Sequence, residues 1–156
     1  MGEQLADVDA VEATLTSSRA LLGVVARSVA DALHDVTLPQ FRVLVVLATV
    51  GTLRIGALAE RMSANPSTFS RTIDRMVAYG WVDRATSADS RREVLIQITE
   101  KGRALVDQVT ARRRHDIAEI LGRLAPAEQR AVSAALALFA EASGEPQSKD
   151  LLVLGV

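Results

Sequence analysis

The sequence predicts a mainly α-helical chain in which a helix-turn-helix is followed by a small β-hairpin. Apolar residues recur at helical spacing through most of the chain. Two short helical patterns flank a turn, Ser63-Ala64-Asn65-Pro66, and the segment 94–98 alternates as a strand does. These three observations place a helix-turn-helix and a hairpin at the centre of the chain, with longer helices on both sides.

Composition removes several functional classes. The chain has 156 residues, no cysteine, 49% hydrophobic residues and only 3% aromatic residues. Disulfides, thiolate metal sites and cysteine nucleophiles are therefore excluded. Because no signal-peptide pattern and no apolar run of about 20 residues is present, we expect a cytoplasmic protein with no membrane partner. So many apolar residues in so small a chain favour a self-associating protein.

The first two helices have clear patterns. Helical spacing predicts a long first helix over residues 8–35. Thr37 and Gln40 then form a capping-box pattern, with Pro39 early in the first turn, where its missing N–H is harmless. This second helix should run to Val50 and end at Gly51.

The central elements are shorter. Residues 52–55 are interpreted as an extended pair beside the hairpin, and 56–62 as a short helix. Asn65 is the expected N-cap of the next helix, with Pro66 at its first position and Gly80 just beyond its end. The strands of the hairpin are expected at 81–86 and 93–99.

Two helices complete the chain. Thr99 should cap a helix that reaches about Arg123, and Pro126 should start a last helix through about Ala142. The segment 131–142 of that helix is apolar nearly all round, which predicts burial between subunits.

Charge is concentrated in the centre. The chain as a whole carries a formal charge of −1, but residues 38–103 hold ten Lys/Arg against six Asp/Glu. Residues 1–37 hold two Arg against six acids. A polyanion responds to a local patch within a Debye length of roughly 8 Å, so the central part is the candidate nucleic-acid surface.

The helix after Asn65 has one face suited to DNA. At about 100° per residue, Arg71 and Arg75 share a face with small hydroxyls, while Phe69, Ile73 and Met76 lie behind. Arginine can bind guanine or phosphate with two hydrogen bonds, and a helix N-terminus favours anions. The alternative is an ordinary solvated face. The predicted DNA-contacting residues of this helix are Ser67, Thr68, Ser70, Arg71 and Arg75.

The hairpin tip supplies a second candidate contact. Its sequence, Ser87-Ala88-Asp89-Ser90-Arg91-Arg92, places Asp89 close enough to hold an arginine. An arginine on a narrow, protruding hairpin can enter the minor groove, where negative potential is concentrated. We therefore expect Asp89, Arg91 and Arg92 to contact DNA, the alternative being an ordinary polar tip.

In order along the chain, these segments resemble the multiple-antibiotic-resistance regulator (MarR) family of winged-helix transcription factors. The resemblance is carried by Leu38-Pro39-Gln40-Phe41-Arg42-Val43-Leu44, Leu58-Ala59-Glu60-Arg61-Met62, Pro66-Ser67-Thr68-Phe69-Ser70-Arg71 with Asp74-Arg75-Met76, Gly80-Trp81-Val82-Asp83-Arg84, and Asp89-Ser90-Arg91-Arg92 with Ile98-Thr99-Glu100-Lys101-Gly102. This chain departs from the family's pattern at Ala125, because a capping Ser or Asp is usual in the family just before Pro126.

The resemblance implies a single domain, residues 1–156, with a winged helix-turn-helix at 37–103. Residues 1–36 and 104–145 would be dimerisation helices, and 146–156 a tail. The 66–80 helix would lie in the major groove and Arg91 in the minor groove. The implied function is a homodimeric regulator of double-stranded DNA, expected to be a repressor, with a small-molecule effector left open.

Some features of the sequence are compatible with other functions. A winged-helix module that binds protein instead of DNA is the alternative function, although it has no need of arginine on both helix and hairpin. His34-Asp35 and His115-Asp116 could meet in a metal site, but two histidines are more often solvated, so no metal or cofactor is expected. Arg112-Arg113-Arg114 could touch phosphate, yet such runs are usually a wet face. No nucleophile–base set indicates an enzyme.

Overall fold

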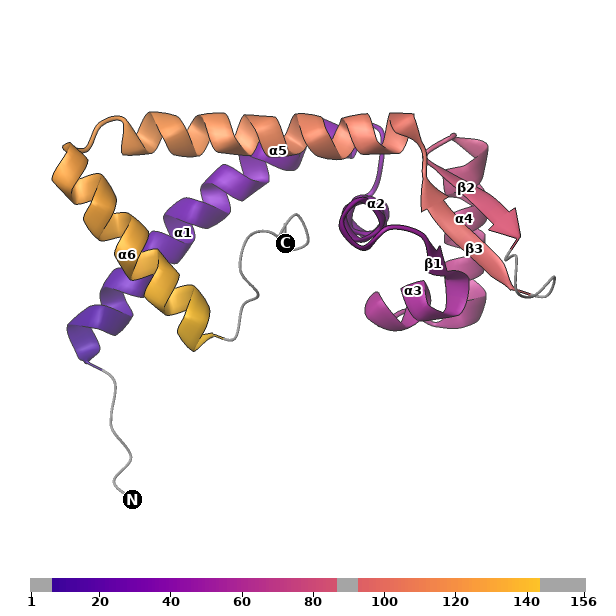
Figure 1. The fold of residues 1–156 in the computed structure, drawn as a ribbon, viewed down its shortest axis with the longest axis horizontal. Helices are drawn as coiled ribbons and strands as arrows, with labels where there is room; N and C mark the ends of the chain where they lie inside the picture. The colour runs from indigo at the N-terminus through magenta and orange to yellow at the C-terminus, as the bar shows by residue number, and fades with distance from the viewer. Residues whose placement is uncertain (1–6, 87–92, 144–156) are drawn as a thin grey trace, which may run out of the picture.

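The computed structural model describes residues 7–86 and 93–143. Long helices α1 (Val8–Ala30), α5 (Glu100–Leu121) and α6 (Pro126–Ala142) form one part of the molecule, and a compact head forms the other (Figure 1). The head contains helices α2 (Leu38–Val50), α3 (Ile55–Arg61) and α4 (Pro66–Ala78) and a small sheet. Helix α5 runs from the head to the far end of the molecule, so it joins the two parts (Figure 1).

The chain between α1 and α2 differs from the prediction of one helix over 8–35. Helix α1 ends at Ala30 and is followed by a short 3₁₀ helix, η1 (Ala32–His34). The Asp31 carboxylate, at the break, accepts a hydrogen bond from Arg112 of α5. Ala32 and Val36 are buried in the core of the head. The break after α1 therefore turns the chain away from α5 and toward α2.

The predicted capping box of α2 is confirmed. The Thr37 N–H donates to Gln40 Oε1 at 2.8 Å, and the Gln40 N–H donates to Thr37 Oγ1 at 3.4 Å. Helix α2 ends at Gly51, whose φ of 87° lies in the region that favours glycine. Between these ends α2 is the central helix of the head; its buried residues are Phe41, Val43, Leu44, Val45 and Leu47.

The sheet has three antiparallel strands in the order β1–β3–β2. Strands β2 (Val82–Thr86) and β3 (Val94–Ile98) form the predicted hairpin; β2 starts one residue later than expected, and β3 is one residue shorter at each end. The predicted extended pair beside it is β1 (Leu53–Arg54), in which Leu53 pairs with Ile96. Val82 pairs with Ile98 next to α5, and Thr86 pairs with Val94 at the opposite end of the hairpin.

The hairpin joins α5 through a very close backbone approach at Gly102. A Cβ atom at this position would lie 2.3 Å from the Trp81 carbonyl oxygen and 2.9 Å from Ile98 Cγ1. Thr99 caps α5, as predicted, by accepting a hydrogen bond from the Gly102 N–H at 3.1 Å. Glycine at 102 therefore lets α5 start directly against the sheet.

Helix α6 has no buried residue within one chain. Leu138 and Phe139 are 68% and 57% exposed. At its N-terminus Ala125 offers no side-chain cap, but Glu128 accepts a hydrogen bond from the Ala125 N–H at 2.7 Å.

Within the described residues, no helix is both long and apolar enough to cross a membrane. The predicted tail, 146–156, lies outside the described residues.

Candidate nucleic-acid interface

The start of α4 follows the predicted capping pattern. Asn65 Oδ1 accepts hydrogen bonds from the Ser67 N–H at 3.1 Å and the Ser67 hydroxyl at 2.8 Å, and Pro66 occupies the first turn. The remaining N–H groups of that turn keep the partial positive charge of a helix N-terminus. This end of α4 therefore favours an anion such as phosphate.

One face of α4 is buried and the other is open, as the helical wheel predicted. Phe69, Ile73 and Met76 are buried in the head. The residues exposed to solvent include Ser67, Thr68, Arg71, Asp74 and Arg75. The exposed face therefore presents two guanidinium groups and two hydroxyls on a helix that the core holds in place.

Two predicted contacts on α4 have restricted geometry. The Ser67 hydroxyl donates a hydrogen bond to Asn65 Oδ1, which holds this side chain at the start of the helix. Ser70 is half-buried and lines a small cavity with Gly56 and Ala59 of α3. Ser70 therefore lies on the α3 side of α4, whereas Arg71 is exposed.

An ion pair that the sequence did not reveal neutralises the acid on this face. Arg84 of β2 donates from Nη2 to Asp74 Oδ1 at 2.6 Å. Among the described residues, no carboxylate forms an ion pair with Arg71 or Arg75. Both arginines thus keep their charge available for an external anion, while the charge of Asp74 is compensated.

The C-terminal end of α4 is held against the start of α5. Gly80 has a φ of 73°, as expected for a glycine after a helix. The Thr99 hydroxyl donates to the Gly80 carbonyl at 2.8 Å, and Lys101 Nζ donates to the Tyr79 carbonyl at the same distance. Lys101 Nζ also lies 4.2 Å from the centre of the Trp81 ring. These contacts fix the direction of α4 relative to α5.

A cavity of about 530 Å³ lies beside this end of α4, within the roughly 300–1,000 Å³ range of small-molecule pockets. It is open to solvent and is lined by residues of η1, the start of α2, the end of α4 and the start of α5. Its charged and aromatic lining residues are His34, Asp35, Arg75, Tyr79, Trp81 and Lys101. Arg75 therefore lines this cavity as well as belonging to the exposed face of α4.

The predicted hairpin-tip contacts, Asp89, Arg91 and Arg92, lie outside the described residues. The base of the hairpin is described: Arg54 of β1 forms an ion pair with Glu93 at 3.0 Å. The same small sheet positions Arg84 of β2 beside Asp74 of α4.

The arginine run of α5 faces α1 in part. Arg112 pairs with Asp31, and Arg113 Nε donates to Ser28 Oγ at 3.2 Å. Burial lowers the pKa of the Arg113 guanidinium. The interpretation of the whole run as a wet face is therefore wrong for the half-buried Arg113, whereas Arg112 and Arg114 are exposed, Arg112 while paired with Asp31.

The two histidine–aspartate pairs do not combine. Asp116 forms an ion pair with Arg27 at 3.7 Å, and His115 Nε2 lies 3.6 Å from Glu119 Oε1. The described ranges hold no group of three or more His, Cys, Asp or Glu residues that could bind a metal ion.

Comparison with known proteins identifies the family. The family model described as MarR family matches residues 36–94. The HTH-type transcriptional regulator YfiV of Bacillus subtilis is 32% identical over 108 residues, which cover 69% of this chain and 68% of YfiV. The crystal structure of RV1404 from Mycobacterium tuberculosis aligns with a TM-score of 0.81 and 40% identity, covering 93% of this chain and 100% of that one.

A structure of a MarR variant from E. coli complexed with operator DNA shares the fold, with a TM-score of 0.54 and 21% identity over 85% of this chain and 94% of that one. The winged arrangement of α2, α3, α4 and the hairpin agrees with these matches. The chain belongs to the MarR family of helix-turn-helix transcriptional regulators.

Proposed function

We propose that this regulator binds a specific, pseudo-palindromic operator in double-stranded DNA as a homodimer and acts as a cytoplasmic repressor. The observation that carries the proposal is the exposed face of α4. There Arg71 and Arg75 have no carboxylate partner among the described residues, and Asp74 is paired with Arg84. A rigid helix with free guanidinium groups and a capped N-terminus suits a major groove.

Each predicted contact has a distinct role. Arg71, at the centre of the exposed face, reads a base edge; Ser67 and Thr68, at the helix start, position phosphate. Arg75 binds near the other end of α4. On the hairpin tip, Arg91 enters the minor groove, with Asp89 orienting it and Arg92 beside it.

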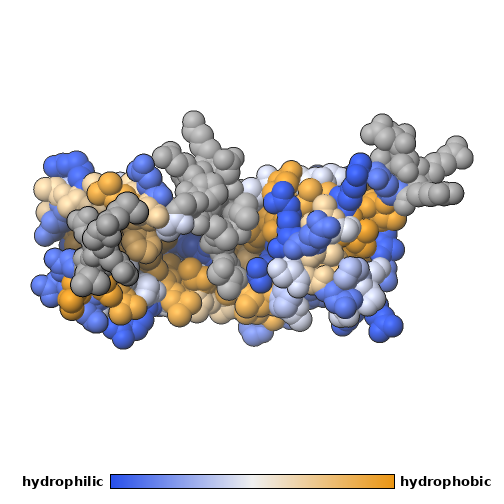
Figure 2. Space-filling model, turned by 90° about the horizontal axis from the view of Figure 1, so that it is seen from below, coloured by the Kyte–Doolittle hydropathy of each residue, from blue (hydrophilic) through white to orange (hydrophobic). Residues whose placement is uncertain are grey.

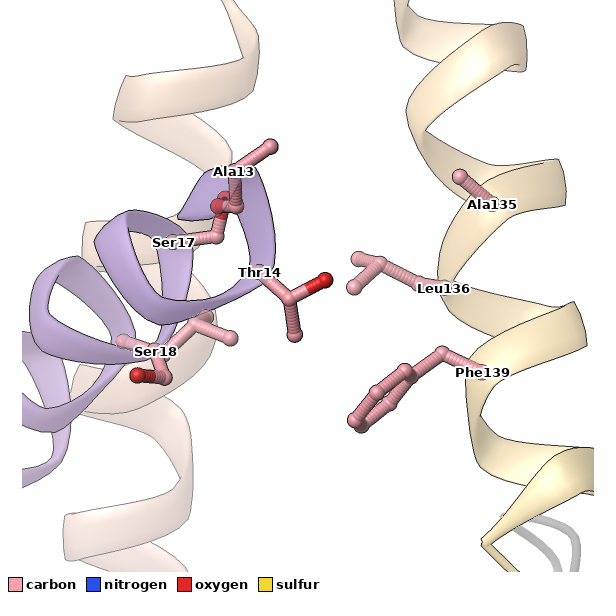
Figure 3. Close-up of a pocket in the computed structure, with 8 residues that line it drawn as sticks. Ala13, Thr14, Ser17, Ser18, Ala135, Leu136 and Phe139 are labelled. Carbon is pink, nitrogen blue, oxygen red and sulfur yellow. Dashed lines mark hydrogen bonds between the residues drawn. The ribbon is translucent and has the colours of Figure 1, made fainter. Parts of the chain in front are cut away.

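The helices outside the head support a dimer. Small hydroxyl and apolar residues of α1 face apolar residues of α6 across a groove of about 320 Å³, with Thr14 opposite Leu136 and Phe139 (Figure 3). Seen from below, apolar side chains are exposed among hydrophilic ones on the long-helix part of the molecule as well as on the head (Figure 2). Since exposed Leu15 and Leu22 of α1 add to this surface, the long helices of a second copy are its proposed partner.

A protein-binding winged helix remains the second candidate, because the exposed apolar surface would also serve a protein partner. The distribution of charge favours DNA, since the surplus of basic residues lies in the head rather than on the long helices.

The experiment is a binding assay with DNA from the region upstream of the gene, with unrelated competitor DNA in excess. Protection of one defined site in the presence of competitor is expected. Equal competition by every sequence, or no binding, would contradict sequence-specific recognition and favour the protein-binding alternative.

A further inference from the structure

Two helices connect the head to the apolar surface proposed for dimerisation. Helix α1 carries the exposed Leu15 and Leu22 of that surface and then leads through η1 into the core of the head. Helix α5 starts in the head, where Leu105 and Val106 are buried, and leads to α6 at the far end (Figure 1). The position of the head relative to the apolar surface therefore depends on how α1 and α5 lie against each other.

Three polar contacts join α1 to α5, in a set that we call the polar seam. In each contact a residue at or near the end of α1 meets one of α5, and the numbers fall along α1 as they rise along α5: Asp31 with Arg112, Ser28 with Arg113, and Arg27 with Asp116. Ser28 is 1% exposed, and its hydroxyl also donates to the Val25 carbonyl at 2.7 Å. The seam therefore has a buried, fully bonded centre with an ion pair on each side.

The charges of the polar seam alternate, so that they fit one register of the two helices. The order along the first helix is Arg27 and then Asp31; along α5 it is Arg112 and then Asp116. Because the helices run in opposite directions, each arginine meets an aspartate. A slip of one helical turn would bring Arg27 opposite Arg112 in one direction, or Asp31 opposite Asp116 in the other. Repulsion between like charges disfavours both slipped arrangements.

We propose that the polar seam fixes the register of α5 on α1 and thereby sets the half-site spacing that the dimer accepts. This role rests on the proposed operator binding by a homodimer, and it requires no contact with DNA. One helical turn is about 5.4 Å, whereas successive base pairs lie about 3.4 Å apart. A slipped head would therefore be displaced by more than one base pair.

The exposure of the seam agrees with a positioning role. Arg112 and Asp31 are 49% and 60% exposed, so their ion pair adds little to folding stability. Exposed ion pairs between packed helices nevertheless determine which orientation the helices adopt, as they do in coiled coils. The apolar contacts beside the seam are non-directional, so they leave the choice of register to the polar ones.

Two charge exchanges that leave the net charge unchanged separate register from simple attraction. In the double variant, Asp31→Arg with Arg112→Asp, both α1 positions are basic and both α5 positions are acidic, so slipped pairs attract as well as the original ones. Adding Arg27→Asp and Asp116→Arg gives a quadruple variant that restores the alternation with every sign reversed. The double variant should therefore lose the register preference, and the quadruple variant should keep it.

The first readout is the distance between the two heads of the free dimer. Because the chain has no cysteine, Ala78→Cys at the exposed end of α4 places one spin label on each protomer. Pulsed dipolar measurements between the two labels then report the separation of the two α4 helices. We expect one narrow distance distribution with the wild-type seam and with the quadruple variant, and a broader or shifted distribution with the double variant.

The second readout is the spacing preference of the unlabelled protein on operator DNA. Operators are lengthened or shortened by one or two base pairs between the half-sites. The wild type and the quadruple variant should prefer the native spacing at least about fivefold, the effect of one mismatched base pair, and the double variant less than about twofold. Affinity for an isolated half-site should be equal in all three, because the seam leaves the exposed face of α4 unchanged.

Neutral variants keep the test decisive if a charge-exchanged chain does not fold. Arg27→Gln with Arg112→Gln removes the cation of each ion pair without reversing a charge, and it should also broaden the label distance. Arg19→Gln with Arg114→Gln is the matched control, since these arginines lie on the same two helices and form no ion pair among the described residues. The control should keep the wild-type distance and spacing preference.

Wild-type distances and spacing preference in the double variant would overturn the inference. Equal loss in the double and quadruple variants would also overturn it, because the alternation of charge would then be irrelevant. Absence of any dipolar distance in the wild type would instead show that no dimer forms, which contradicts the proposed function. If the dimer forms but binds no operator, the label distances still decide whether the seam fixes the register.

Discussion

Arg71 and the hairpin arginines are expected to contribute differently to binding. Arg71→Ala should cost about 1–3 kcal/mol at the operator and relax the preference for its sequence, because the side chain is proposed to read a base. Affinities for the operator and for single-base variants measure this. Since Arg71 is exposed, the variant should remain folded.

Arg91→Ala should weaken binding to many sequences and lower the salt slope by about one, because the minor groove offers a degenerate code. Asp89→Ala should have the same effect to a smaller extent. Full affinity and selectivity in both arginine variants, with normal folding, would show that this surface does not read DNA. Arg123→Ala is the matched control, since it lies beyond α5 at the end away from the head.

Gly102 is expected to tolerate no side chain. Gly102→Ala would bring a Cβ to 2.3 Å from the Trp81 carbonyl oxygen, a backbone atom that cannot move aside freely. We expect a loss of about 1–3 kcal/mol in the free energy of unfolding, measured with denaturant. Gly56→Ala is the control, because no atom lies within 4 Å of its added Cβ and alanine favours the helix. A Gly102→Ala protein as stable as the wild type would refute the close approach.

At the scale of elements, local chemistry made helix boundaries predictable. The capping side chains of Thr37, Asn65 and Thr99 act within three residues, so their sequence pattern was sufficient. The Gly80 turn was predicted for the same reason. The break after Ala30 was not, because Asp31 is held by Arg112, a residue distant in sequence.

The candidate site, like the helix boundaries, was predictable only where it depends on residues close together in the sequence. Helical periodicity identified the exposed face of α4, but the pairing of Arg84 with Asp74 depends on how β2 packs beside α4. The cavity beside Arg75 could not be predicted from the sequence either, because residues of four separate elements line it. Contacts within one helix could be inferred, whereas contacts between elements required the fold.

The α4–β2 ion pair is expected to matter for binding more than for stability. Arg84 and Asp74 are 40% and 55% exposed, so the pair should contribute only about 0–1 kcal/mol to folding. Arg84→Ala should lower affinity for all DNA sequences, because an uncompensated Asp74 would repel phosphate. Asp74→Asn in the same chain should restore part of the loss. If the double variant binds no better than Arg84→Ala, the compensating role is wrong.

The whole molecule is expected to be a dimer. Because α6 buries no residue within one chain, light scattering at low concentration should give about twice the 16.7 kDa chain mass. Phe139→Arg should shift the protein toward monomer and weaken operator binding. Val50→Arg, which places the same charge on an exposed apolar position of the head, should remain dimeric. A stable wild-type monomer would remove the basis for two half-sites.

The measurement that tests DNA recognition most directly is operator binding by the full chain across a salt series, combined with footprinting. A dimer that places two α4 helices in successive major grooves predicts half-site centres about 10 bp apart. With about six to ten phosphates neutralised, affinity should fall about 10³–10⁵-fold between about 50 and 200 mM salt. Protection of a single short half-site, or affinity indifferent to salt, would contradict the proposal that this regulator reads DNA as a two-fold dimer.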